Sequence, residues 1–327
     1  MQKWKTAVAT IGLGAVLIAG FALLVTSDND APTPEETVRE TPAPPTDTQT
    51  ELVDETRTPT PPPVAEPPPE RRVAQDQRIV IKGSNTLGAK MVPSLMEEFE
   101  VELRRFGVAV SPEIAAEGSG TGINAMLDNE ADIAMSSRHI SDGEVVKANE
   151  RGIRVREVAV AYDSIAIVVN EDSPIDNLTA KQVEELFTGN IRDWGQLRVR
   201  GLRPGPVSVY TRDSASGTFK EFQDMALRGQ DYGGNRQEMK GNEQIAEEVS
   251  NNRRGVGYVG LAFIEKSGLK VVAVDGMLPN DPDYPIRRPL FYYIPNEPSD
   301  MTNLFIGFTL SPKGQAIVRK SGFLPLY

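Results

Sequence analysis

The residue types best suited to binding chemistry gather in one stretch, Thr211-Arg-Asp-Ser-Ala-Ser-Gly-Thr-Phe219. An alternating β-branched segment precedes it and apolar residues recur at helical spacing after it, so it joins an expected strand to an expected helix start. The free N–H groups of a helix start, with the hydroxyls of Ser214, Ser216 and Thr218, suit a tetrahedral oxyanion better than a metal ion or a carbonyl substrate. Arg212 adds a guanidinium. The simpler alternative is a helix cap beside a surface arginine.

Two earlier turns have the same design. The apolar strand expected at 78–81 is followed by Lys82-Gly-Ser-Asn-Thr86 and then by apolar residues at helical spacing from Leu87 to Phe99. A strand expected at 108–110 leads to Ala115-Ala-Glu-Gly-Ser-Gly-Thr-Gly122, after which a helix is expected. The glycines of this turn let a backbone approach a ligand closely.

Polar residues also end the short strand expected at 132–136. In an open parallel sheet the C-terminal ends of strands face the ligand crevice, which would bring Ser136, Ser137 and Arg138 toward the three turns. The structural alternative is that the two serines cap the following helix and that Arg138 pairs with a carboxylate such as Asp132.

Asp163 lies near the start of a long strand expected at 158–170. The near-continuous apolar run of this strand is typical of a buried parallel sheet. A carboxylate at the edge of such a strand needs a partner, and a protonated oxyanion can donate a hydrogen bond to it.

Composition weakens several other chemistries. The chain has no Cys and a single His, His139, so thiolate sites and disulfides are excluded, and a serine–histidine triad or a zinc site would depend on that one residue. The glycine-rich turn lacks dinucleotide-fingerprint spacing, and no Walker-type Gly-Lys-Ser/Thr occurs. We therefore expect no cofactor, no metal and no catalytic residues. Of the net charge of −11, the N-terminal residues 1–27 contribute +2 and residues 28–78 contribute −7, which leaves −6 for the globular region 79–327. This acidic balance argues against nucleic acid as a partner.

The N-terminal residues 1–27 resemble a transmembrane signal-anchor. Lys3 and Lys5 precede an uncharged run from Ala7 to Val25, which at roughly 1.5 Å per residue just crosses a bilayer core. Lysines before the span and acidic residues after it predict a cytoplasmic N-terminus with the rest of the chain outside. A cleaved signal peptide ending near Ser27 is the alternative.

Residues 28–78 have the composition of a disordered linker. They contain 12 of the 25 prolines, no aromatic residue, and 12 acidic against 5 basic side chains. Such a segment cannot bury enough apolar surface to fold, and its proline runs favour an extended tether.

Residues 79–327 read as one α/β region, because expected strands and helices alternate throughout. Further strands are expected at 255–260, 271–274 and 289–294, and one terminal helix from Phe305 to Val318.

The chain resembles the phosphate-binding proteins of Pst-type ABC importers over nearly all of residues 79–327, through seven short sequence blocks. The resemblance rests on their occurrence in order, and the blocks are Gly83-Ser-Asn-Thr86, Glu117-Gly-Ser-Gly-Thr-Gly122, Asp132-Ile-Ala-Met-Ser-Ser-Arg138, Ala161-Tyr-Asp163, Leu186-Phe-Thr-Gly-Asn-Ile-Arg-Asp-Trp194, Arg212-Asp-Ser-Ala-Ser-Gly-Thr218 and Gly255-Val-Gly-Tyr258.

That family has a two-lobed type II periplasmic binding protein fold with two crossing strands and a dehydrated phosphate in the cleft. The resemblance implies a first lobe at about 79–162 and 260–327 and a second at about 163–259, with crossings near Asp163 and Gly260. It implies an extracytoplasmic binding protein that delivers phosphate to a permease or reports its concentration to a sensor partner. The implied phosphate ligands are Ser84, Thr86, Ser119, Thr121, Ser137, Arg212, Ser216, Gly217 and Thr218.

The chain departs from the family at Ser137, where better known members have an aspartate that accepts the proton of hydrogen phosphate and so rejects sulfate. We expect Asp163 to take over this acceptor role. The departure leaves sulfate, molybdate or a phosphonate as alternative ligands. Outside the binding class, the alternatives are a phosphate-releasing hydrolase with Ser216 or Thr218 as nucleophile and a structural surface domain without a ligand.

Overall fold

The computed structural model describes residues 77–327. The expected signal-anchor and nearly all of the expected linker lie outside these residues. Within 77–327, no helix has the length and apolar character needed to cross a membrane.

Strands and helices alternate along the described residues, as the sequence predicts. The strands are β1 (Arg78–Gly83), β2 (Ser111–Ala115), β3 (Ile133–Ser136), β4 (Val155–Asn170), β5 (Asn177–Leu178), β6 (Ser208–Arg212), β7 (Arg236–Met239), β8 (Gly255–Gly260), β9 (Leu269–Val274) and β10 (Arg287–Pro295). The α-helices are α1 (Asn85–Gly88), α2 (Met91–Arg104), α3 (Ser119–Leu127), α4 (Asp142–Glu150), α5 (Ala180–Phe187), α6 (Gly217–Met225), α7 (Asn242–Asn251), α8 (Asp300–Leu310) and α9 (Pro312–Lys320). Short 3-10 turns lie at η2 (Trp194–Leu197) and η3 (Leu261–Phe263).

The strands form a mixed sheet in the order β2-β1-β3-β10-β4-β8-β6-β7. β1 is parallel to β2 and β3, and β6 is parallel to β7 and β8. β4 is antiparallel to β8, β9 and β10, so the parallel setting predicted for this strand is wrong. Its apolar run follows from burial alone, since all but one of the residues 160–170 are buried.

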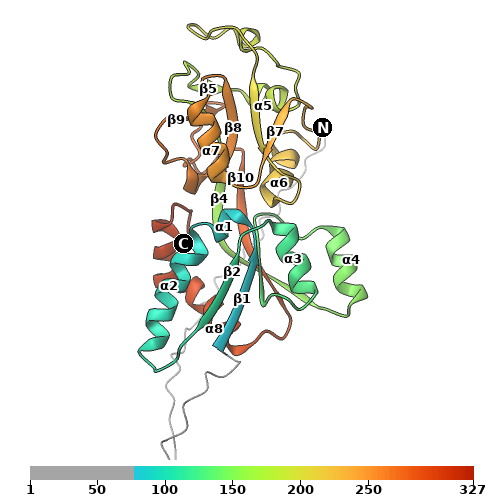
Figure 1. The fold of residues 1–327 in the computed structure, drawn as a ribbon, viewed down its shortest axis with the longest axis vertical. Coiled ribbons are helices and arrows are strands. Elements are labelled where there is room, and N and C mark those ends of the chain that lie inside the picture. The colour runs from blue at the N-terminus through green and yellow to red at the C-terminus, as the bar shows by residue number, and fades with distance from the viewer. Residues whose placement is uncertain (1–76) are drawn as a thin grey trace, which may run out of the picture. The chain divides into compact units, whose positions relative to one another are not determined.

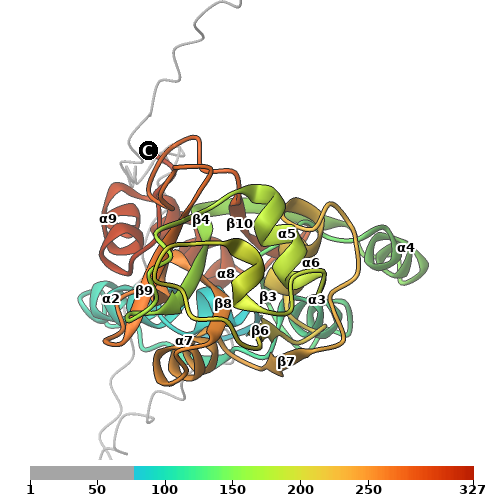
Figure 2. The same ribbon diagram turned by 90° about the horizontal axis from the view of Figure 1, so that it is seen from above.

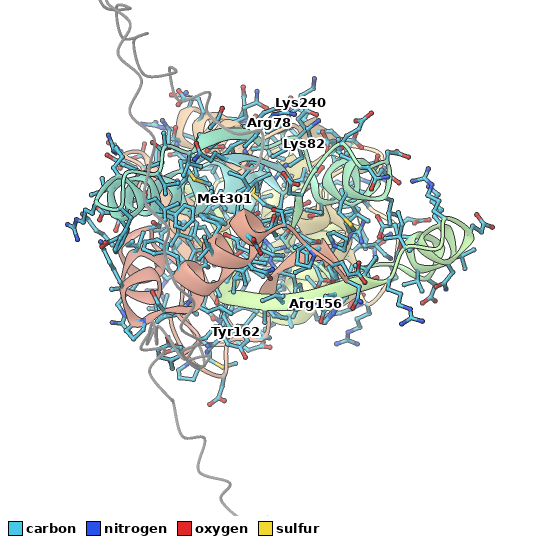
Figure 3. All side chains as sticks on the ribbon, turned by 90° about the horizontal axis from the view of Figure 1, so that it is seen from below. Arg78, Lys82, Arg156, Tyr162, Lys240 and Met301 are labelled. Carbon is cyan, nitrogen blue, oxygen red and sulfur yellow. The ribbon has the colours of Figure 1, made fainter. Side chains whose placement is uncertain are left out.

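β4 runs through two lobes (Figure 1). Its first half pairs with β10, and its second half pairs with β8 and β9. The first lobe contains β1–β3, β10, α1–α4, α8 and α9; the second contains β5–β9 and α5–α7. Figure 2 views the same elements from above. In Figure 3, Arg156 and Tyr162 mark the first half of β4, and Met301 marks α8.

One lobe limit differs from the limit that the resemblance implies. Val272, Val274, Tyr284 and Ile286 pack in the apolar cluster of the second lobe. The segment 269–286 therefore belongs with the second lobe by packing, and β10 is the strand that returns the chain to the first lobe.

Three predicted elements have different bounds. β2 begins at Ser111, so the strand predicted at 108–110 is wrong; Pro112 is tolerated because β2 lies at the sheet edge. The helix predicted from Leu87 to Phe99 is divided into α1 and α2. The single terminal helix is divided into α8 and α9 because Ser311 has extended backbone geometry and caps α9 through the N–H of Gly314.

Candidate functional site

Four hydroxyl side chains from separate turns meet where the lobes face each other. Thr86 and Thr218 place their Oγ1 atoms 3.1 Å apart, Ser119 and Ser137 their Oγ atoms 3.3 Å apart, and Ser137 Oγ lies 3.5 Å from Thr218 Oγ1. All four side chains are fully buried. Three of these residues come from the first lobe and Thr218 from the second.

Local hydrogen bonds hold three serine oxygens in or next to this cluster. Ser84 caps α1 by accepting from the N–H of Thr86, and Ser216 caps α6 by accepting from the N–H of Thr218. Ser119 Oγ accepts from the N–H of Ser137 at 3.1 Å. Each of these hydroxyls accepts a backbone hydrogen and still has one hydrogen of its own that it can donate.

Two helix N-termini approach one another at this place. Helix α3 begins at Ser119 and α6 at Gly217. A Cβ atom on Gly217 would lie 2.2 Å from Ser119 Oγ and 2.7 Å from Ser137 Oγ, so only glycine permits this contact. Each helix start carries partial positive charge, and two such ends repel one another unless negative charge lies between them.

The guanidinium of Arg212 is buried next to Asn85 of α1 without a carboxylate partner. Arg212 is 1% exposed, and it donates to Lys240 O at 2.6 Å and to Asn85 Oδ1 at 3.4 Å. Within 77–327 its Nε has no partner and the side chain forms no ion pair. Burial lowers the pKa of Arg212, yet a guanidinium stays protonated in proteins.

Sequence reasoning missed the asparagines that hold Arg212. Asn85 Oδ1 accepts from the backbone N–H of Asn242 at 3.1 Å and from its side chain at 2.8 Å. Asn242 is fully buried, and its Oδ1 accepts from Gly260 N. These contacts join α1 to α7 across the lobes. Nothing in the single sequence marks either asparagine as more than a turn residue.

Sequence reasoning also missed Arg288, which faces Asp163 in the pairing of β10 with β4. Arg288 is 1% exposed and Asp163 fully buried. Arg288 Nη2 lies 2.9 Å and Nε 3.3 Å from Asp163 Oδ2, while Asp163 Oδ1 accepts from Leu261 N at 2.9 Å. The sequence did contain a useful signal. Arg288, Leu290 and Tyr292 are at every second position, so in a strand the arginine lies on the same face as two residues that are usually buried.

The remaining predicted residues lie apart from the cluster. Thr121 and Ser214 are exposed. Ser136 Oγ donates to Arg138 O. Arg138 pairs with Glu144, at 2.7 and 2.8 Å, and not with Asp132.

The helix-cap alternatives have mixed outcomes. Ser141 caps α4 in a capping box with Glu144, so the expectation that Ser136 and Ser137 would cap this helix is wrong. Ser216 does cap α6. Arg212, however, is buried, so the alternative of a surface arginine beside that cap is wrong.

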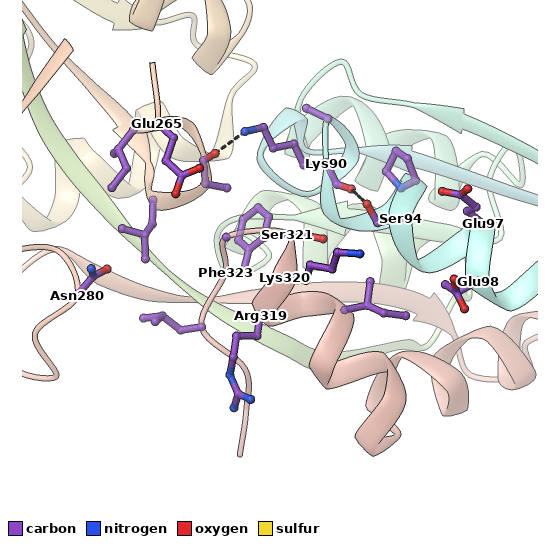
Figure 4. Close-up of a pocket in the computed structure, with 18 residues that line it drawn as sticks. Lys90, Ser94, Glu97, Glu98, Glu265, Asn280, Arg319, Lys320, Ser321 and Phe323 are labelled. Atoms are coloured by element: carbon purple, nitrogen blue, oxygen red, sulfur yellow. Dashed lines mark hydrogen bonds between the residues drawn. The ribbon is translucent and has the colours of Figure 1, made fainter. Parts of the chain in front are cut away.

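Other features of the described residues offer less chemistry. A cavity of about 900 Å³ between α2, η3 and the C-terminal residues is lined by Lys90, Glu97, Glu265 and Lys320, among others, and Lys90 there donates to Ala262 O (Figure 4). None of the clustered hydroxyls lines it. Residues 77–327 contain no group of three or more His, Asp or Glu side chains that could hold a metal ion.

Comparison with known proteins finds phosphate-binding proteins among the relatives of this chain. The family profile of the PBP superfamily domain matches residues 43–313. The phosphate-binding protein PstS of Pseudomonas aeruginosa is 30% identical over 266 residues, which cover 74% of this chain and 82% of that protein. The PstS of Borreliella burgdorferi is 27% identical over 253 residues, covering 72% and 88%.

Solved structures have the same architecture. A Clostridium perfringens protein described as a phosphate ABC transporter substrate-binding protein, solved with bound phosphate, has a TM-score of 0.67 and 28% identity over 76% of this chain and all of that one. A phosphate transport receptor of Vibrio cholerae, at 23% identity and a TM-score of 0.60 over 76% of this chain and 99% of that one, supports the fold.

Proposed function

Because the chain belongs to the PBP superfamily and, within it, to the family of PstS phosphate-binding proteins, we propose that it binds inorganic phosphate between its two lobes. It is a substrate-binding protein by family and not an enzyme. Its role is to deliver phosphate to an ABC importer or to report the phosphate concentration to a sensor partner.

One observation carries the proposal. The buried Arg212 has no carboxylate partner within 77–327 and donates to Asn85 of α1 and to Lys240 O. Two helix N-termini, those of α3 and α6, also face each other. A buried charge without a partner is costly, as is the approach of two positive helix ends. A bound oxyanion offsets both costs, because it supplies the negative charge and accepts hydrogen bonds from every side.

We assign the ligand contacts to the residues that lie around this point. The N–H groups at the starts of α3 and α6, including that of Gly217, donate to the anion together with hydroxyl groups and with Arg212. The hydroxyl donors are Ser84, Thr86, Ser119, Ser137, Ser216 and Thr218. Thr121 is left out because its side chain is exposed.

The contacts across the lobes support a closing motion. Thr86 and Ser137 in the first lobe each approach Thr218 in the second, so a full set of donors exists only when the lobes are together. A ligand that gains contacts only in the closed form shifts the population toward that form.

The N-terminal residues support a location outside the cytoplasmic membrane. We propose that residues 1–27 anchor the chain as a single-pass segment and that the acidic, proline-rich linker carries the binding domain away from the bilayer. Genes for a permease and an ATPase beside the gene for this chain would favour transport, and a sensor kinase gene in their place would favour sensing.

Calorimetry on the full-length chain tests the proposed ligand. We expect heat on titration with phosphate, saturation at one phosphate per chain, and a loss of at least tenfold in affinity for Arg212→Met. Absence of phosphate binding by the wild type would refute the proposal. Binding of sulfate, molybdate or a phosphonate in preference to phosphate would assign the site to that oxyanion.

No observation favours the hydrolase. The oxygen partners of Thr218 Oγ1 are the hydroxyls of Thr86 and Ser137, and its nitrogen partner is Arg288, which cannot accept a proton. Steady phosphate release from a phosphomonoester would overturn this conclusion.

A further inference from the structure

Arg288 is a fully buried cation near the site and, unlike Arg212, has a carboxylate partner. It lies at the start of β10, opposite Asp163 of β4, and the two side chains are 2.9 Å apart. Both strands connect the lobes. The ion pair therefore lies in the connection about which the lobes would move.

The same guanidinium contacts both lobes beyond this pair. Its Nη1 donates to the backbone oxygen of Ser137 at 3.0 Å, at the end of the first-lobe strand β3. Its Nη2 donates to Thr218 Oγ1 at 2.9 Å, in the first turn of the second-lobe helix α6. Arg288 thus touches two of the residues that we assign to the phosphate site.

The contact with Thr218 has a defined direction. Arginine has five N–H donors and no acceptor, so Thr218 Oγ1 must accept. The single hydroxyl hydrogen of Thr218 then has to point elsewhere. The oxygens near it are Thr86 Oγ1 at 3.1 Å and Ser137 Oγ at 3.5 Å, both on the proposed site.

We propose that Arg288 is a positioning residue for the bound oxyanion: it holds the Thr218 hydroxyl as a donor directed at the anion, and Asp163 holds Arg288. The inference rests on the proposed function. A hydroxyl that accepts from a cation is also a stronger donor, because hydrogen bonds polarise one another in a buried chain.

The inference gives Asp163 a role different from that of direct proton acceptor. Asp163 Oδ2 accepts two N–H groups of Arg288, and Oδ1 accepts Leu261 N. If Asp163 anchors Arg288, Asp163→Asn weakens phosphate and sulfate by the same factor. If Asp163 accepts the proton of phosphate, the same variant changes the ratio of the two affinities, and that result overturns the anchoring role.

A double-mutant cycle with Thr218→Val tests the positioning role by calorimetry with phosphate. We expect Arg288→Gln to weaken binding about 10- to 100-fold, the range for losing one charge-assisted hydrogen bond. In the Thr218→Val background the same change should cost less than threefold, because the hydroxyl through which it acts is gone. We expect Arg288→Lys to restore part of the affinity.

Two results would overturn the inference while leaving the proposed function intact. One is wild-type phosphate affinity in Arg288→Gln. The other is an equal loss in both Thr218 backgrounds, which a purely structural role predicts. Failure of the wild type to bind phosphate refutes the proposed function itself, so the two failures are distinguishable.

Two further variants keep the test usable. Arg288→Gln leaves Asp163 buried without its partner, so the protein could fail to fold. The double variant Asp163→Asn/Arg288→Gln removes both charges, and we expect it to bind phosphate as weakly as Arg288→Gln. Wild-type affinity in the double variant would overturn the inference.

Arg287→Gln is the matched control, since Arg287 lies over the ring of Tyr162 and away from the hydroxyls. We expect its phosphate affinity to be unchanged. A loss equal to that of Arg288→Gln would overturn the assignment.

Discussion

The backbone of Gly217 comes closer to Ser119 and Ser137 than any other residue type would allow. A Cβ atom there would lie 2.2 Å from Ser119 Oγ, which forces the lobes apart. We expect Gly217→Ala to weaken phosphate binding at least tenfold, since the added methyl blocks closure and not the fold of either lobe. Calorimetry measures the affinity, and thermal unfolding without ligand should change little.

Gly234→Ala is the control for this substitution. A Cβ at Gly234, also in the second lobe, meets nothing within 4 Å. Equal losses of affinity in the two variants would show that the close approach of α6 to α3 is not required for binding.

Ser137 is the residue at which this chain departs from the family pattern. An aspartate there would bring a negative charge within reach of the bound anion. We expect Ser137→Asp to lower sulfate affinity at least tenfold while phosphate, which can donate a proton, is less affected. Competition titration measures the ratio, and Ser137→Asn, which adds similar bulk without charge, is the control. An unchanged ratio would mean that discrimination is made elsewhere.

Around the proposed site, the sequence indicated the turns and Arg212 but not Arg288. Ser84, Thr86, Ser119 and Thr218 follow strands and start helices, a local pattern that one sequence shows. Arg288 lies 125 positions from Asp163, and no local pattern reports a pairing at that separation. The only signal in the sequence was the spacing of Arg288, Leu290 and Tyr292 at every second position.

Helix α4 carries a charged contact that makes part of the stability depend on pH. Glu144 caps α4 through Ser141 and pairs with Arg138. Burial raises the pKa of Glu144, but the hydrogen bonds and charge of Arg138 and the bonds from Ser141 outweigh it, so that the net shift is downward. A lowered pKa means stability that is present above the ordinary Glu range and lost as the pH falls through the folded-state pKa.

We expect Glu144→Gln to lower the free energy of unfolding by about 1–3 kcal/mol near pH 7. The difference from the wild type should shrink as the pH falls, because the wild-type carboxyl then becomes protonated as well. Urea unfolding at a series of pH values measures both quantities. Glu150→Gln, at an exposed position of the same helix, should match the wild type, and a pH-independent deficit in Glu144→Gln would contradict the assignment.

The sequence predicted whether a segment is a strand or a helix more reliably than it predicted how the strands pair. Most strands and helices around the site occur near where periodicity placed them, although β2 begins later than predicted and the helix predicted from Leu87 is divided. Burial alone made β4 look like a parallel strand. Burial produces the same apolar run in either orientation, so sequence could not distinguish them. The division between α8 and α9 depends on the backbone of Ser311, which apolar spacing does not record.

At the scale of the whole binding region, phosphate should draw the lobes together. Without an anion, Arg212 and the facing starts of α3 and α6 oppose the closed form. Small-angle scattering on the full-length chain should show a smaller radius of gyration with saturating phosphate, and Arg212→Met should reduce the change. No difference between the two conditions would argue for a site that is already closed.

Sheet order also bears on how the chain is made. β3 and β4 are consecutive strands, yet β10 lies between them and supplies both Phe291, opposite Ser136, and Arg288, opposite Asp163. A ribosome delivers β10 only after more than a hundred further residues, so the seam that holds the proposed site stays open until synthesis is nearly complete. We therefore expect a chain that stops before β10 to lack Arg288 and the pairing of β3 and β4 with β10, and not to bind phosphate.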